Sequence, residues 1–150
     1  MKLKHQRIPT DSEYQNYDGG HCPILWKETS ESWCCPGCGR NKREILRWTL
    51  RKPGDTVFWG WIAPLVRHHD HSTFDRFPQT VVCGDCNSAD GHAKRELNLP
   101  SNWSFSPEEI RQFVTAVPHG SCCIDYQKAQ NLYDRAGANE ILDSEIETVI

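Results

Sequence analysis

Long hydrophobic runs are absent from this chain of 150 residues, and its mean hydropathy is −0.67. A membrane helix needs about 18 or more consecutive apolar residues, so the sequence predicts no membrane span. The first 20 residues also lack the apolar stretch of a secretory signal, which favours a cytoplasmic protein. A basic excess is lacking as well, because the net charge is −3 and the pI is about 6.1. By itself that average is atypical of a nucleic-acid-binding protein.

Charge is distributed unevenly, however. The last eleven residues carry four acidic side chains and no cation, so the acidic average comes partly from this end. Residues 40–52 hold six cations against Glu44 alone, and they suit either a surface that follows a DNA backbone or an ordinary solvated face. These six cations are Arg40, Lys42, Arg43, Arg47, Arg51 and Lys52.

Cysteine is abundant, with eight residues in the chain. Without a secretory signal, so many cysteines favour a metal site over a disulfide framework. Two Cys-x-x-Cys pairs, separated by 44 residues, predict a four-sulfur site for structural zinc, since four thiolates leave no open position for a reacting water. A redox dithiol and metal-free thiols are the weaker alternatives. The predicted ligands are Cys35, Cys38, Cys83 and Cys86.

The other four cysteines have no assigned role. Cys34 precedes Cys35 directly, which leaves the register of the first pair open. Cys22, Cys122 and Cys123 are expected to be small buried side chains.

A run of three imidazoles and one carboxylate, His68-His69-Asp70-His71, lies between the two cysteine pairs. A chance cluster of histidines on a loop is the plain alternative. The run follows an apolar stretch that is typical of a strand, and Asn87 follows the second cysteine pair directly. Neighbouring side chains on a strand point to opposite sides, so one histidine can bind a metal ion while the next faces a water.

The order of these motifs resembles the HNH, or ββα-metal, endonucleases, and most closely the phage recombination endonuclease VII branch. The residues that carry the resemblance are the two cysteine pairs, the run HHDH and the segment CGDCNSADGHAK, and they cover roughly residues 33–97. The resemblance implies that His68 and Asn87 bind a catalytic divalent ion, Mg²⁺ or Mn²⁺, and that His69 is the general base. It implies that Asp90 reaches the ion directly or through water, and that His71 contacts the scissile phosphate or holds a water.

Two positions depart from that branch: His68 stands where the branch has Asp, and Asp90 where it has Glu.

The resemblance implies hydrolysis of DNA phosphodiester bonds to 3′-hydroxyl and 5′-phosphate ends, in a phage or prophage protein. A neutral imidazole suits the removal of a proton from water near neutral pH. Three cations near the predicted site are expected to bind substrate: Lys94, Arg95 and Arg67.

The predicted fold is α+β: a small zinc-held ββα core with an upstream β-hairpin and a C-terminal helix pair. We expect a flexible segment at 1–20, the nuclease domain at 21–100, a helical extension at 101–137 and an acidic tail at 138–150. The predicted strands lie at 44–51, 56–61, 64–69 and 79–83, and the predicted helices at 88–97, from Ser106, and at 125–136 with Gly137 as its stop.

Three further functions fit the sequence less well. One is a zinc-containing nucleic-acid-binding module without catalysis, and another is a zinc-stapled protein-interaction domain. The third is a structure-specific junction-resolving endonuclease acting as a homodimer, for which the C-terminal helices could supply the interface.

Overall fold

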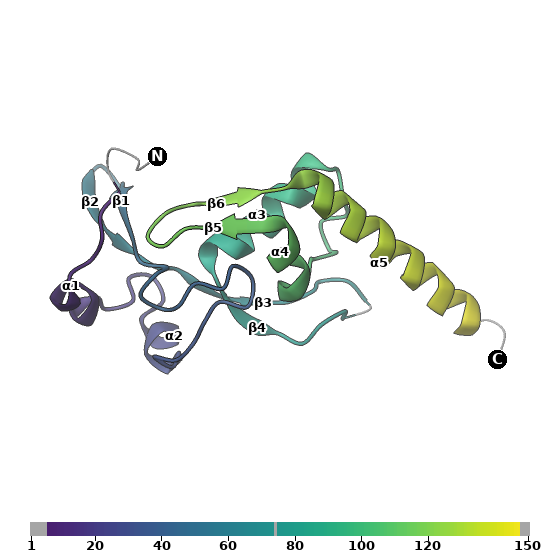
Figure 1. Cartoon of the computed structure of the whole chain (residues 1–150), viewed down its shortest axis with the longest axis horizontal. Helices are drawn as coiled ribbons and strands as arrows, with labels where there is room; N and C mark the ends of the chain where they lie inside the picture. Colours follow the sequence, from purple (N-terminus) through teal and green to yellow (C-terminus); the bar gives the residue numbers. More distant parts are fainter. Residues whose placement is uncertain (1–5, 74, 148–150) are drawn as a thin grey trace.

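The computed structural model describes residues 6–73 and 75–147, with side chains in the last helix described as far as Gly137. Within these residues, six short strands pair into three two-stranded antiparallel sheets, and five helices lie around them (Figure 1). This small mixed architecture confirms the predicted α+β class. The elements are α1 (Asp11–Asn16), α2 (Pro23–Glu28), β1 (Arg47–Arg51), β2 (Phe58–Ile62), β3 (Leu65–His68), β4 (Thr80–Cys83), α3 (Gly84–Glu96), α4 (Pro107–Phe113), β5 (Val114–Ala116), β6 (Cys122–Ile124) and α5 (Tyr126–Glu147).

The predicted hairpin is present, and the two further predicted strands in the first two thirds of the chain pair into a second hairpin. Strands β1 and β2 pair from Arg47 opposite Ile62 to Arg51 opposite Phe58. Strands β3 and β4 pair from Leu65 opposite Cys83 to His68 opposite Thr80. The second hairpin leads directly into helix α3, so a ββα unit contains the run of histidines.

Helix α3 begins at Gly84, four residues before the predicted start at Ser88, and Cys83 is its N-cap residue. The second cysteine pair therefore lies in the first turn of a helix rather than in a separate loop. Thiolates are favoured there because the free N–H groups and the dipole of a helix N-terminus stabilise negative charge. Asn87 consequently sits on a helix, on the turn that also carries Cys86.

The C-terminal third contains a hairpin that the sequence analysis missed. The capping box at Ser106 is confirmed, because its side chain accepts from Glu109 N and the Glu109 side chain accepts from Ser106 N. Helix α4 nevertheless ends at Phe113, and Val114 opens strand β5. Val114 and Val117, which suit the apolar face of a longer helix, therefore lie outside α4, and Val117 is 54% exposed. A β-branched Val-Thr pair favours the extended backbone at this point.

Gly137 does not end the last helix, which runs to Glu147 and projects from the body of the protein (Figure 1). A glycine stops a helix by adopting positive φ, and Gly137 is not among the described residues with positive φ. In a helix interior glycine costs only about 1 kcal/mol relative to alanine. The predicted acidic tail therefore begins as helix, although its side chains lie outside the described residues. The homodimer predicted through the C-terminal helices stays a prediction.

The beginning of the chain is also more ordered than expected. Residues 1–5 of the predicted flexible segment lie outside the described residues. After them, Thr10 and Glu13 form a capping box at the start of α1. The chain then turns after Asp18, where Gly19 and Gly20 both have positive φ.

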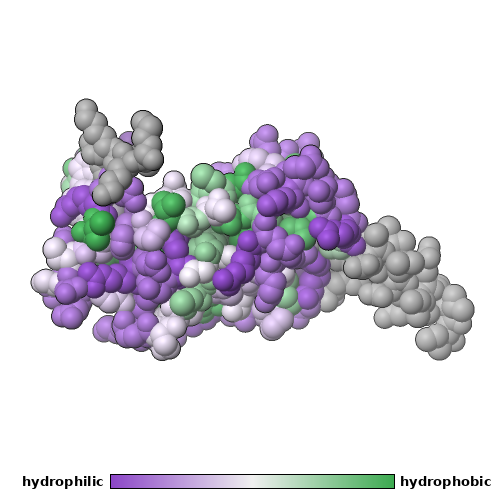
Figure 2. All heavy atoms as spheres, viewed as in Figure 1, coloured by the Kyte–Doolittle hydropathy of each residue, from purple (hydrophilic) through white to green (hydrophobic). Residues whose placement is uncertain are grey.

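The hydrophobic core lies between α3, α4 and the β3–β4 hairpin and includes the fully buried Leu46, Val82, Phe105 and Ile110. The face seen in Figure 2 is mostly hydrophilic, with apolar side chains gathered near its middle. Among the described residues, no helix combines the length and the apolar character that crossing a membrane requires.

Candidate functional site

Four sulfur atoms meet at the base of the β3–β4 hairpin. The Sγ atoms of Cys35, Cys38, Cys83 and Cys86 all lie within 4.8 Å of one another, and three of the four side chains are buried. Gly37 makes this approach possible, since a Cβ atom there would lie 2.7 Å from the Cys86 sulfur. The predicted cluster is thus confirmed, and it can hold one metal ion such as zinc.

The spacing of the sulfurs fits that ion. The Sγ atoms of Cys35 and Cys86 are 3.7 Å apart, as are those of Cys38 and Cys83. Zn–S bonds of about 2.3 Å in a tetrahedron place neighbouring sulfurs roughly 3.8 Å apart. The pKa of Cys38 is lowered, because hydrogen bonds from the Cys35, Cys83 and Cys86 thiols and from Arg40 stabilise its thiolate.

Arg40 is a buried cation beside the cluster, and its side chain is only 3% exposed. Its Nε donates to Cys38 Sγ at 3.3 Å, and its Nη2 reaches Asp85 Oδ2 at 2.9 Å. Its Nη1 donates to the carbonyl oxygens of Val117 and Gly120, in the turn between β5 and β6. A tetrathiolate zinc site carries two negative charges, so Arg40 offsets part of them and ties the C-terminal hairpin to the cluster.

Two of the six cations in residues 40–52 are therefore unavailable to DNA. Besides Arg40, Lys42 is buried, and its ammonium donates to the Thr29 carbonyl oxygen and lies 4.4 Å from the centre of the Trp26 ring. The sequence signal for Arg40 was its position two residues after Cys38, from which a long cation can fold back onto a thiolate.

The remaining cysteines differ from expectation, because none of them is buried. Cys34 is exposed while Cys35 is buried, which settles the register of the first pair in favour of Cys35. Cys22 and Cys122 are half-buried, and Cys123 is exposed. Hydrogen bonding with Cys86, followed by the nearby Arg40 charge, lowers the pKa of Cys122.

A cleft of about 360 Å³ opens beside the cluster, between β3, α3 and residues 101–104. It gathers every residue predicted for catalysis and two of the three predicted for substrate binding. These cleft residues are His68, His69, His71, Asn87, Asp90, Arg67 and Lys94. Arg95 is not in the lining; it is exposed on α3, and its guanidinium lies 3.2 Å from His92 Nδ1.

His68 and Asn87 meet in the floor of the cleft, where His68 is 3% exposed. The His68 Nε2 lies 2.7 Å from the Phe105 carbonyl oxygen, which can only accept, so Nε2 carries the proton. In the neutral ring Nδ1 then presents a lone pair, 3.2 Å from Asn87 Oδ1. Two acceptor atoms face each other at the separation, roughly 3 Å, of adjacent ligands on an octahedral Mg²⁺.

His69 directly follows β3 and is exposed, whereas His68, the last residue of the strand, is buried, which agrees with the predicted alternation. Its Nδ1 lies 3.3 Å from the Arg67 carbonyl oxygen, which orients the ring and leaves Nε2 as its basic atom. The ring of His71 packs edge-on against it, with centroids 4.2 Å apart. Both imidazoles therefore stand together at the mouth of the cleft.

Asp90 and Lys94 are engaged with each other. The Asp90 carboxylate is buried and pairs with Lys94 Nζ at 2.9 Å, while its Oδ1 accepts from Phe105 N at 2.8 Å. Lys94 Nζ also donates to Ser104 Oγ at 3.3 Å. In this arrangement Asp90 holds the segment of residues 103–105 in place, and with it the carbonyl group that fixes His68.

Asp70 is a buried residue whose importance the sequence analysis missed. It accepts from the Ser72 hydroxyl, Arg76 N and Ser104 N, and so anchors the loop that carries His71. Burial raises the pKa of Asp70, but these hydrogen bonds outweigh burial and lower it overall. The Asp-x-Ser spacing, which is typical of a turn stabilised by its own side chain, was the available signal.

No family model, curated protein or solved structure matches the chain. The chemistry of the site therefore rests on the residues just described.

We predict that Cys35→Ser and Cys34→Ser differ sharply, although the two residues are neighbours. Losing a buried metal ligand should remove the zinc and lower the midpoint of thermal unfolding steeply, because binding free energy of such sites contributes to folding. Losing the exposed Cys34 should change neither quantity. Zinc content per chain and thermal unfolding of the two variants check this, and equal behaviour would contradict the assigned register.

We also predict that Arg40→Met releases zinc faster than the wild type. Residues that hydrogen-bond to metal ligands typically contribute about 10-fold or more to metal affinity. The matched control is Arg47→Met, because Arg47 also pairs with Asp85 but is 30% exposed. Zinc transfer to a chromogenic chelator measures the effect, and equal release rates in the two variants would show that Arg40 does not hold the site.

Proposed function

We propose that this protein is a metal-dependent endonuclease of the HNH type that hydrolyses phosphodiester bonds in DNA. The four cysteines would hold a structural zinc ion beneath the ββα unit. His68 and Asn87 would hold the catalytic Mg²⁺ or Mn²⁺, and His69 would act as the general base.

The meeting of His68 Nδ1 with Asn87 Oδ1 is the observation that carries this proposal. With the proton on His68 Nε2 and the amide oxygen of Asn87 turned to the ring, two lone pairs 3.2 Å apart repel each other beside a buried imidazole. A divalent cation between them removes that repulsion, and the Phe105 carbonyl group prepares the arrangement by fixing the tautomer of His68.

The chain's own residues supply the remaining functions. His69 Nε2 is free to take a proton from a water at the cleft mouth, since Nδ1 is held by the Arg67 carbonyl group. His71 stands beside it, where it can donate to a phosphate oxygen or hold the water. When bound, the divalent ion would stabilise the negative charge that develops on the phosphate and the leaving oxygen.

A phosphodiester substrate also suits the charge around the cleft. Arg67 is about half exposed at its edge, and its ion pair with Glu28, at 3.3 Å between two exposed groups, is weak enough to be exchanged for a phosphate. Arg95 lies exposed on the neighbouring helix. Both can neutralise backbone charge without leaving a buried partner unpaired.

One observation favours a second candidate, a zinc-containing nucleic-acid-binding module without catalysis. The carboxylate of Asp90, predicted as a further contact of the divalent ion, is occupied by Lys94 and Phe105 N. If that pairing persists in solution, the ion has two protein ligands, and the site could bind a phosphate strand without cutting it.

We predict that the zinc-loaded protein nicks supercoiled plasmid in Mg²⁺ or Mn²⁺ and not in chelator, and that His69→Ala loses this activity. General-base catalysis typically contributes about 10²-fold to 10⁴-fold in rate, so a loss of about 100-fold or more is expected. Conversion of supercoiled to open-circular DNA, followed on gels, measures the rate.

The matched control is His92→Ala, which removes an exposed imidazole of helix α3 that lies outside the cleft lining. This variant should keep the wild-type rate, and all three proteins should contain the same amount of zinc. Plasmid binding without nicking by the zinc-loaded wild type would reject the nuclease in favour of the binding module.

A further inference from the structure

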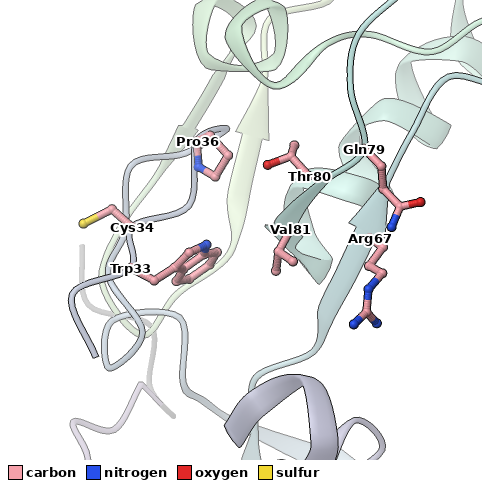
Figure 3. A pocket seen from close by; sticks show the side chains of 7 residues that line it. All are labelled: Trp33, Cys34, Pro36, Arg67, Gln79, Thr80 and Val81. Carbon is pink, nitrogen blue, oxygen red and sulfur yellow. The ribbon is translucent and has the colours of Figure 1, made fainter. Parts of the chain in front are cut away.

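A second hollow, of about 510 Å³, lies next to the cleft on the other side of the β3–β4 hairpin. One wall is the loop that leads into the first cysteine pair, with Trp33 before the pair and Pro36 within it, and strand β4 faces it with Thr80 and Val81 (Figure 3). Ligand sites in proteins are typically about 300–1,000 Å³, so the hollow is large enough for one nucleotide.

The two hollows are connected through one side chain. Arg67 lines both of them, and it pairs with Val81 across the hairpin while the next residue, His68, turns to the cleft. Within the described part of the chain, strand β3 pairs with β4 alone, so no further described strand covers its other edge. A polynucleotide backbone that left the cleft over this edge would pass Arg67 and reach the second hollow.

The lining offers the three kinds of contact that a nucleotide needs. The half-buried indole of Trp33 provides a flat face, and Val81 stands across from it (Figure 3). The exposed amide of Gln79 can both donate to and accept from the edge of a base. Arg67 supplies the positive charge for the adjoining phosphate, because its pairing with Glu28 is exposed and exchangeable.

We propose that this hollow binds one unpaired nucleobase of the strand whose backbone lies in the cleft. The proposal rests on the proposed function, because it takes the occupant of the cleft to be a nucleic acid. An indole can stack only on a base whose face is free, so the hollow selects single-stranded or locally opened DNA over continuous duplex. Trp33 provides the stacking face, Gln79 contacts the base edge, and Arg67 spans the two sites.

Photo-crosslinking of the wild-type protein tests the position of the base directly. The full-length, zinc-loaded protein is irradiated with a short oligothymidylate that carries a single iodouracil, without Mg²⁺ or Mn²⁺ so that no cleavage occurs. Mass spectrometry should place the crosslink on Trp33. A crosslink that falls instead on Trp59, an indole 44% exposed on strand β2, would overturn the proposal.

Affinity measurements test the stacking energy. The oligothymidylate is compared with an abasic oligomer of equal length, which has the same phosphates and no bases. The wild type should prefer the thymidylate by at least about fivefold, the low end of what one stacked base supplies. Trp33→Ala should lose this preference while retaining the affinity for the abasic oligomer.

Trp59→Ala is the matched control and should behave as the wild type does. Gln79→Ala changes an exposed residue and is the second test variant. It replaces Trp33→Ala if that variant does not fold or does not bind zinc, and we expect it to reduce the preference for the thymidylate. Equal affinity for the two oligomers in the wild type would mean that the surface binds phosphate alone, and it would overturn the proposal.

These outcomes are separate from those of the proposed function. Plasmid nicking without a crosslink at Trp33 would reject the base pocket and leave the nuclease in place. A crosslink at Trp33 in a protein that never nicks DNA would establish the pocket and reject the nuclease.

Discussion

The convergence of four cysteine sulfurs is the interaction on which the rest of this structure depends. Two of them come from a loop that has little regular structure, and the other two from the end of β4 and the first turn of α3. Bringing them together fixes where helix α3 starts relative to the β3–β4 hairpin. The described residues form three two-stranded sheets, which provide few hydrogen bonds between strands. In a chain of this size, a metal ion bound by the four cysteines would therefore supply much of the stability of the fold.

The cleft depends on that constraint through a short series of contacts. Cys86 and Asn87 are neighbours on α3, so the position of the sulfur cluster determines where the Asn87 amide meets His68. Asp90, one turn further along the helix, holds Phe105 N, and the Phe105 carbonyl group holds His68. A displacement of α3 would therefore separate both partners of His68 at once. This coupling joins a structural metal site and a proposed catalytic site within one ββα unit.

Sequence patterns predicted the local features well, because their causes are local. The two Cys-x-x-Cys pairs, the hairpin around residues 47–62, the strands at 65–68 and 80–83, and the capping box at Ser106 each follow from residues close together in the chain. Alternation along β3 likewise predicted that His68 and His69 face different sides. The predicted catalytic residues come from β3, the loop after it and α3, and the fold brings them together in one cleft.

The features that sequence reasoning missed depend on tertiary contacts. The hydrogen bond from Phe105 N to Asp90, those from Arg40 to the carbonyl groups of Val117 and Gly120, and the carbonyl group of Phe105 on His68 join segments whose proximity is set only by the fold. The end of α4 at Phe113 was missed because Val114 suits a helix face and a strand equally, and its pairing with Ile124 decides between them. Gly137 was wrongly predicted to end the last helix, because a glycine ends a helix only when its φ angle is positive, and the sequence alone does not determine that angle.

The claim that a four-sulfur metal centre organises the molecule is tested most directly by X-ray absorption at the zinc edge of the purified protein. The account predicts one zinc ion per chain surrounded by four sulfur atoms at about 2.3 Å, with no nitrogen or oxygen ligand. A shell that mixes sulfur with nitrogen or oxygen, or a folded protein without zinc, would contradict it.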